Sequence, residues 1–401
     1  MWLLLVQVSL GLAAIALGAA AQVCNSFPDT VIKDQDDIDA LAVDCDTIDG
    51  NLVIDSEFSG PFVLPGIANI TSIAPLGTSK LFNDPVQITS LELPNLQYLE
   101  LLELGPLTRI QKLDLPKLES LPILALIVEA SLDELEFPAL ETAGFVAIRG
   151  NMTDVRFDAL RTVESGLEVV HSARTRQTET SMDISFAALE VAHIISFQGN
   201  ISSFSLPGFS VLGTDAAEDE VFENPVSIIA LDGPAIDVDL PKLSSVNGSL
   251  EIMGNIGSLS LPSLKDITQS LRVEAAIPLS LDLPIESVEN ITLSGAIERI
   301  SLRSLRSWSF LNVSSNLELD CDAFISGLRS SDNDDVGDVL CGASGEEPKA
   351  VEGTGNKTET NEDAETQAEH DDEGLAIREY PHVSFTVATG VVGIIMAHAL
   401  F

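Results

Sequence analysis

The sequence is poor in basic and in aromatic residues. Of its 401 residues, 20 are Lys or Arg and 62 are Asp or Glu, so the formal net charge is −42 at pH 7. Nucleic acid and anionic lipid both need clustered basic side chains, and these partners are therefore excluded. Aromatic residues make up 5% of the chain, which supplies a sugar-stacking cleft poorly. The acidic charge suits a large soluble surface and is compatible with cations, basic proteins and neutral glycans.

Signatures of catalysis and of cofactor binding are also missing. The sequence contains no Walker A, His-Glu-x-x-His, Gly-x-Ser-x-Gly or Cys-x-x-Cys motif, and its five histidines have no metal-ligand spacing. We therefore expect no enzyme, no metal site and no cofactor. One alternative stays open: a polysaccharide-acting β-helix enzyme, a glycoside hydrolase or lyase, in which two carboxylates on stacked turns form a catalytic pair. The candidate carboxylates are Asp237, Asp239, Glu251 and Glu274.

The N-terminal residues 1–21 predict a secretory signal peptide. They form an apolar run that closes on Ala19-Ala20-Ala21, which offers small residues for cleavage before Gln22. The alternative is an N-terminal membrane anchor, but the apolar stretch is short and ends in a cleavage-type triplet.

The C-terminal residues 374–401 predict a glycosylphosphatidylinositol (GPI) attachment signal. Residues 383–401 are mostly apolar and have no basic residue after them, whereas a spanning helix normally has a basic cytoplasmic flank. Gly374 is the expected attachment residue, and Asp371 and Asp372 stay open as alternatives. A simple tail-anchored helix is the competing interpretation. With the GPI anchor, the chain would sit on the outer leaflet of the plasma membrane, in the cell wall, or both.

Residues 345–373 predict a disordered, acidic stalk. They hold eleven acidic residues and two lysines, with almost no aliphatic side chain. Such a segment cannot bury enough apolar surface to offset the loss of chain entropy on folding.

Four cysteines lie in two pairs near the ends of the central region, Cys24 with Cys45 and Cys321 with Cys341. An even count in a secreted chain indicates disulfides, and four cysteines allow three connectivities. Sequence proximity favours the two local bridges.

The central region repeats with a period of about 21 residues. Each repeat carries Leu-Pro-x-Leu or a close variant, and the proline ends a strand because it lacks the N–H that a ladder requires. Asp158, Ala187 and Arg303 replace this proline in three repeats. The motif begins at Leu93, Leu115, Phe137, Phe157, Phe186, Leu206, Leu240, Leu261, Leu283 and Leu302.

Apolar residues alternate within each repeat, which predicts two short strands and no helix. Gly-Asn separates the strands at 150–151, 199–200 and 254–255, because both residues tolerate the left-handed backbone of a sharp corner. The next two apolar residues then follow the asparagine at +4 and +6, as at Val155 and Phe157. Asparagines at stacked corners can also hydrogen-bond the backbone of the neighbouring turn.

One such turn cannot bury its leucines, but stacked turns share a continuous core. Residues 22–344 therefore predict an all-β fold, a right-handed parallel β-solenoid of about ten turns that resembles receptor L domains and leucine-rich repeats. Short helices at about 36–43 and 323–328 would cap its open ends. Similar segments around 76–86 and 212–226 further suggest two duplicated lobes, 22–190 and 191–344.

Seven Asn-x-Ser/Thr sequons predict N-glycosylation of a secreted chain. Asn69, Asn247, Asn290, Asn312 and Asn356 are the preferred acceptors. Asn151 and Asn200 are less preferred acceptors, because at the Gly-Asn corner an inward-facing amide competes with glycosylation.

The segment from Cys45 to Ile54, the Leu-Pro-x-Leu turns, the late Leu319-Asp320-Cys321 and the anchor-type tail together resemble fungal GPI-anchored cell-wall organisation proteins of the extracellular-mutant and sporulation-specific type. The resemblance covers about residues 22–344 and the layout of the tail. It implies receptor L-domain-like repeats and a role in cell-wall integrity without catalytic residues. Two features depart from the family: the missing turn prolines and the acidic stalk, which replaces the usual Ser/Thr-rich one.

The sequence thus favours a non-catalytic wall component that binds cell-wall glycans or wall proteins along its sheet faces. A signalling receptor is disfavoured, since no segment is expected to reach the cytoplasm.

Overall fold

The computed structural model describes residues 23–75, 87–171, 180–212, 226–231, 233–329, 335–345 and 348–351. They all belong to the first of two compact units, 1–355. The expected signal peptide, Gly374, Asn356, the apolar tail and most of the predicted stalk lie outside the described residues. Within the described part, no helix is long and apolar enough to cross a membrane.

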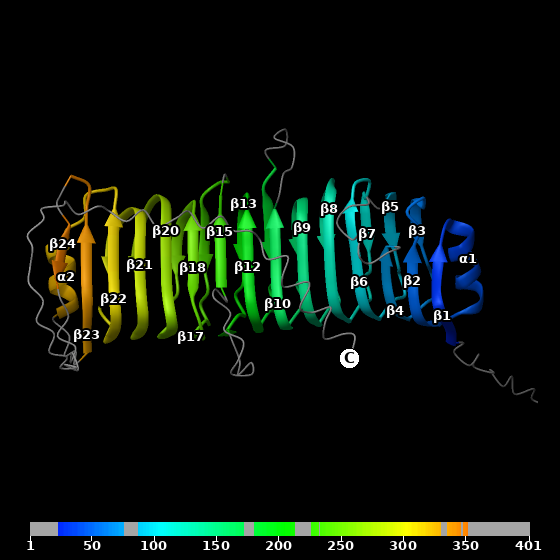
Figure 1. Ribbon diagram of the computed structural model, residues 1–401, viewed down its shortest axis with the longest axis horizontal. Coiled ribbons are helices and arrows are strands. Elements are labelled where there is room, and N and C mark those ends of the chain that lie inside the picture. Colours follow the sequence, from blue (N-terminus) through cyan, green and yellow to red (C-terminus); the bar gives the residue numbers. More distant parts are fainter. Residues whose placement is uncertain are drawn as a thin grey trace, which may run out of the picture. The chain divides into compact units, whose positions relative to one another are not determined.

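The described chain is a parallel β-solenoid of about 11 turns, which confirms the predicted fold class. Consecutive coils pair in register, so that Thr142 lies opposite Ser120 on one side and Thr162 on the other (Figure 1). The main ladder runs through β1 (Val23–Ile32), β2 (Thr47–Ile54), β4 (Asn69–Pro75), β6 (Tyr98–Leu107), β8 (Ser120–Glu136), β9 (Thr142–Arg156), β10 (Thr162–His171), β12 (Val191–Gly199), β14 (Val211–Leu212), β15 (Val226–Ala230), β17 (Ser245–Val246), β18 (Leu250–Gly254), β20 (Asp266–Asp282), β21 (Ser287–Ser301), β22 (Ser307–Ser315) and β23 (Asp335–Gly342).

A second ladder forms the other side of each coil. The long strands β8, β9, β20 and β21 bend around the corner and contribute to both ladders. The other members of the second ladder are β3 (Ser59–Val63), β5 (Gln87–Glu92), β7 (Lys112–Asp114), β11 (Met182–Ser185), β13 (Ile201–Ser205), β16 (Ile236–Asp239) and β19 (Ile256–Ser260).

Between the ladders lies a continuous core of buried Leu, Ile, Val and Phe side chains. Three consecutive coils place phenylalanine where other coils have leucine, and these rings stack. The ring centroids of Phe137 and Phe157 are 5.0 Å apart, and those of Phe157 and Phe186 are 5.2 Å apart. The predicted +4 and +6 residues are core residues, since Val155 and Phe157 are fully buried.

The Leu-Pro-x-Leu motif forms a tight turn in which the last backbone N–H donates to the first carbonyl, as from Leu118 to Leu115 over 3.3 Å. The same turn forms where proline is replaced: the corresponding distance from Leu160 to Phe157 is 3.1 Å, with Asp158 at the proline position. Proline presets this turn but is not required for it, because most residues can adopt its backbone angles.

The opposite corner depends on glycine. Gly254 has a φ of 105°, and a β-carbon on it would collide with the backbone carbonyl oxygen of Ala230 in the preceding coil. The next residue, Asn255, donates its side-chain amide to the carbonyl of Gly233 over 2.7 Å. The expected bond from a corner asparagine to the neighbouring turn therefore forms at this position.

Helices and disulfides cover both ends of the described stack, as predicted. Helix α1 (Gln35–Asp44) begins after Asp34, whose side chain accepts the N–H of Asp37, and its Ile38 is fully buried against the first coils. Helix α2 (Cys321–Arg329) lies at the other end. The bridges are Cys24–Cys45 and Cys321–Cys341, with Cα–Cα distances of 5.6 and 5.8 Å.

The first residues of the predicted stalk include a short strand that pairs with the last coil. Strand β24 (Lys349–Val351) pairs antiparallel with β23, and Lys349 forms an ion pair with Asp322 over 2.8 Å. Val351 packs against the core. An edge strand offers unpaired backbone groups, and β24 satisfies those of β23 although its composition favours disorder.

The ladder is continuous where the sequence suggests a border between two lobes. On the C-terminal side of that border, Val191 of β12 pairs with Thr162 of β10 and with Val211 of β14. The segments similar in sequence, around 76–86 and 212–226, lie almost entirely outside the described residues.

Candidate functional site

The two ladders present outer faces of different chemistry. Because side chains alternate along a strand, every second residue of each ladder points away from the core. We call the outward side of the ladder from β1 to β23 the main face. The outward side of the other ladder, from β3 to the second half of β21, is the second face.

The main face carries a row of apolar residues across five consecutive coils. Each residue is in register with the next, and the large side chains are half-buried, so that part of each is exposed. We call this row the apolar stripe, and it consists of Leu101 on β6, Ile123 on β8, Phe145 on β9, Gly166 on β10 and Ile194 on β12.

The stripe has no gap at its glycine. The ring of Phe145 leans over Gly166 and lies 3.4 Å from the point that a β-carbon there would occupy, with the Ile194 β-carbon 3.6 Å away on the other side. Ala125 and Ala147 stand in the next outward column of β8 and β9. The result is a flat apolar surface without protruding polar groups at its centre.

Charges beside the stripe are paired or buried. Arg149 forms an ion pair with Glu168 over 2.6 Å. Glu103 is in register with Ala125 and is only 7% exposed. Burial raises the pKa of the Glu103 carboxyl above its usual value, because removal from water disfavours the charged form. Glu100, the neighbour of Leu101 on β6, is an exception, because its side chain is exposed.

The four carboxylates of the enzyme alternative do not gather in one place. Glu251 and Glu274 lie on the main face, where Arg272 binds both, over 3.3 and 3.1 Å. Asp237 and Asp239 lie on the second face, on β16. The guanidinium of Arg272 thus occupies the pair on the main face, and on the second face the hydroxyl of Ser258 donates to Asp237.

The second face is polar, with acidic and serine side chains in alternate coils. Asp183 accepts hydrogen bonds from the hydroxyls of Ser202 and Ser203, both over 2.7 Å. Near the N-terminal end, Lys112 binds Glu92 over 2.7 Å and lowers the pKa of that carboxyl. Covering this face would remove its charged and hydroxyl groups from water, at a cost in solvation free energy.

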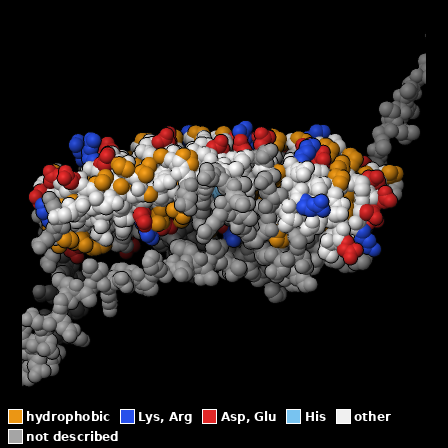
Figure 2. Space-filling view, turned by 90° about the horizontal axis from the view of Figure 1, so that it is seen from above, with side chains coloured by type: hydrophobic (Ala, Val, Ile, Leu, Met, Phe, Trp, Pro, Cys, Tyr) orange, Lys and Arg blue, Asp and Glu red, His pale blue; other side chains and the backbone are white. Residues whose placement is uncertain are grey.

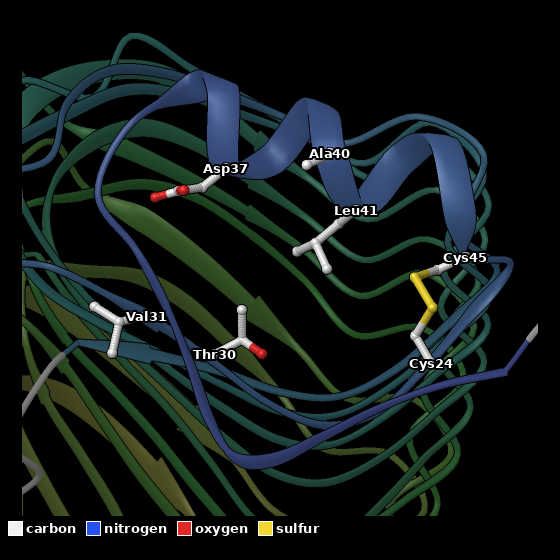
Figure 3. Close-up of a pocket in the computed structure, with 7 residues that line it drawn as sticks. All are labelled: Cys24, Thr30, Val31, Asp37, Ala40, Leu41 and Cys45. Carbon is white, nitrogen blue, oxygen red and sulfur yellow. A yellow bond between two sulfur atoms is a disulfide. The ribbon is translucent and has the colours of Figure 1, made fainter.

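A small hollow lies at the N-terminal end, between α1 and β1 (Figure 3). Leu41 points into it from the helix, and the Cys24–Cys45 bridge closes one side. Its polar lining consists of Thr30 and Asp37, and Asp37 already accepts the backbone N–H of Lys33 over 2.9 Å. The hollow is a packing gap beneath the cap and offers no convergent polar groups for a ligand.

The predicted glycosylation sites fall in different places. Asn290 and Asn312 lie on the main face, on β21 and β22, at the end remote from the apolar stripe. Asn247 is exposed before β18. Asn69 opens β4, and its amide is 3.4 Å from the Thr47 hydroxyl.

The two corner asparagines are more enclosed. Asn151 accepts the hydroxyl of Thr180 over 2.9 Å. The amide oxygen of Asn200 is buried and has no hydrogen-bond partner in the described part of the chain. Both amides are therefore less accessible to a glycosylating enzyme than that of the exposed Asn247.

One buried polar residue was not singled out from the sequence. His171 ends β10 at the corner and is 6% exposed; its Nε2 has no hydrogen-bond partner among the described residues. Burial lowers the pKa of its imidazole. Within the same residues, no group of His, Cys, Asp or Glu has an arrangement that could hold a metal ion. In the sequence, a histidine is marked as functional by metal-ligand spacing to other ligands, and His171 has no such spacing.

No protein-family model, curated protein or solved structure matches this chain, so no relative assigns a function to either face.

Proposed function

We propose that this chain is a non-catalytic, GPI-anchored cell-surface glycoprotein that supports cell-wall organisation and integrity. It acts by binding wall proteins or wall glycans on the faces of its solenoid. The observation that carries the proposal is the apolar stripe beside compensated charges, since flat apolar surfaces on soluble proteins mark interaction sites. The resemblance to fungal wall proteins, the signal peptide and the anchor signal favour the same role.

Binding and anchoring are tested separately. The secreted, glycosylated chain is applied to isolated wall fractions and to an array of wall glycans, with released sugars assayed in parallel. Retention on a wall fraction, weakened by Phe145→Glu but not by Ser205→Glu on the second face, supports the proposal. The proposal is contradicted if both variants bind as well as the wild type. It is also contradicted if sugars are released and the double substitution Glu251→Gln with Glu274→Gln abolishes that release.

The cellular role is tested by deletion of the gene in the source organism. We expect sensitivity to wall-perturbing dyes, rescued by the full chain and not by a form that ends at Glu373. Equal rescue by both forms would contradict the role of the anchor.

A further inference from the structure

We propose that the apolar stripe is a self-association site, where a second copy of this chain packs main face to main face with its solenoid axis reversed. The proposal rests on the proposed function only in that it assumes a secreted, glycosylated chain. It deepens that function by naming one partner of the main face.

Charge restricts where two copies can meet. Each copy carries a formal charge of −42, so most pairs of surfaces repel one another. Beside the stripe, the Arg149–Glu168 pair is neutral as a unit, and Glu103 is buried with a raised pKa. The centre of the stripe therefore holds no exposed, unpaired charge, and two identical acidic bodies repel one another less there than over the rest of their surfaces.

End-to-end stacking is opposed by the same charges. Helix α1 has Asp36 and Asp37 in its first turn and no basic residue in its last turn. Asp34 and Asp39 are exposed beside them. Figure 2 shows acidic side chains at the ends of the described stack, together with some Lys and Arg side chains. Like charges at the ends disfavour a filament and leave the faces for association.

The chemistry of the stripe selects a protein rather than a glycan. Its outward groups are Leu101, Ile123, Phe145 and Ile194, with no hydroxyl, amide or free carboxylate at its centre. A sugar surface would leave its hydroxyls unpaired against these side chains, at a desolvation cost. An apolar surface from another protein matches them, and a second copy carries that surface in the required register.

The positions of the sequons at Asn290 and Asn312 favour the reversed arrangement. With a two-fold axis parallel to the strands and over β9, Phe145 meets Phe145 of the other copy, while Leu101 faces Ile194. Strand β20 then faces β1, so β21 and β22 project beyond the end of the other copy. Glycans on Asn290 and Asn312 therefore stay clear of the interface. With parallel axes, these glycans would lie directly opposite one another. Asn69, at the start of β4, and Asn247, before β18, lie at the border of the overlap, where the strands begin.

The overlapping area is sufficient for a stable dimer. The eleven overlapping coils, from β1 to β20 with β14–β15 and β17–β18 counted as one coil each, cover about 50 Å at a spacing of about 4.8 Å. Five residues along each strand span about 17 Å. This is roughly 850 Å² per copy, close to the ~800 Å² per partner of standard interfaces. The stripe supplies the apolar centre, and polar residues such as Arg272 supply the rim.

The first test is the mass of the secreted chain in sedimentation equilibrium at about 10 μM, where a Kd near 1 μM gives mostly dimer. We expect the mass of two chains. Ile194→Glu should weaken association at least about tenfold, because it places an unpaired charge in the apolar centre. Ser205→Glu is the matched control, since it adds the same charge to the same coil on the second face.

The second test locates the interface. All four cysteines of the chain are in disulfides, so an added cysteine is the one free thiol. On oxidation, Ala147→Cys on β9 should form a covalent dimer, whereas Ser205→Cys should not. A monomeric wild-type chain, equal weakening by both glutamate variants, or equal cross-linking by both cysteine variants would overturn the proposal. Wall-fraction binding by a monomer would still support the proposed function, so the two failures are distinguishable.

Discussion

The side-chain amide of Asn255 donates to the backbone carbonyl of Gly233, one coil earlier, across 2.7 Å. The residue is half-buried, so this bond ties two coils together at a corner where the strands themselves are interrupted. Asn255→Ala should lower the free energy of unfolding by about 1–2 kcal/mol, since it leaves that carbonyl without its donor. Thermal unfolding followed by circular dichroism measures the change. Asn316→Ala is the control, because Asn316 holds an equivalent position with an exposed side chain; equal losses in both variants would contradict the role of the bond.

Gly254→Ala should be more damaging than glycine substitution elsewhere. The new methyl group would collide with the carbonyl oxygen of Ala230, in addition to the strain of a φ of 105°. We expect a loss of about 3 kcal/mol or more, or failure of secretion. Gly66→Ala separates the two causes, because Gly66 also has a positive φ but open space around it, and it should cost only about 1–2 kcal/mol.

The phenylalanine stack gives a third prediction. Phe157 lies between Phe137 and Phe186 and is fully buried. Phe157→Ala should lower the stability by about 3–5 kcal/mol through the cavity that it leaves. Phe157→Leu should cost less than about 1.5 kcal/mol, because leucine fills this position in most other coils. A leucine variant as unstable as the alanine variant would show that the ring contacts themselves, rather than filled volume, determine stability here.

Glu103 should make the free energy of unfolding depend on pH. Its folded-state pKa lies above the usual 4.5 because of burial, so between pH 4.5 and that higher value the folded state binds more protons than the unfolded state. Stability from this group is therefore present below pH 4.5 and is lost as the pH rises through the folded-state pKa. Glu103→Gln should raise the melting temperature at pH 7 relative to wild type and have little effect at pH 4. A gain of the same size at both pH values would contradict this assignment.

The C-terminal disulfide gives a local prediction. Cys321→Ser with Cys341→Ser should destabilise the chain by about 3 kcal/mol in the chain-entropy model for a loop of about twenty residues. Hydrogen exchange should lose protection first in α2, β23 and β24, because each coil contacts chiefly its neighbours. Uniform loss of protection, including β8 to β12, would indicate that the solenoid unfolds as a single unit.

Local sequence signals predicted most of the fold. Alternating apolar residues, the turn motif and the corner glycines are set by neighbours in sequence, so Val155, Phe157 and the turn at Leu115–Leu118 were correctly placed. The two helices and both disulfides were also predicted. Strand β24 was missed because its acidic surroundings favour disorder, and it is ordered only by pairing with the edge of β23.

Less of the candidate site than of the fold could be predicted from the sequence. Leu101, Ile123, Phe145 and Ile194 come from four different repeats, and only the register between coils aligns them. The ion pair of Arg149 with Glu168 has the same origin, as does the contact of Arg272 with both Glu251 and Glu274. A one-residue shift in register would turn each of these side chains to the other side of its sheet.

The disulfide between Cys321 and Cys341 also has a mechanical consequence. Tension that enters from the C-terminal side reaches Cys341 through β24 and the end of β23, and the bridge passes it directly to Cys321. The nineteen residues between them, 322–340, include most of α2 and of β23 and then carry none of the load. A pull from the C-terminal side would therefore be resisted first by the shear strength of β22 against β21, and the disulfide would keep the last coil from separating on its own.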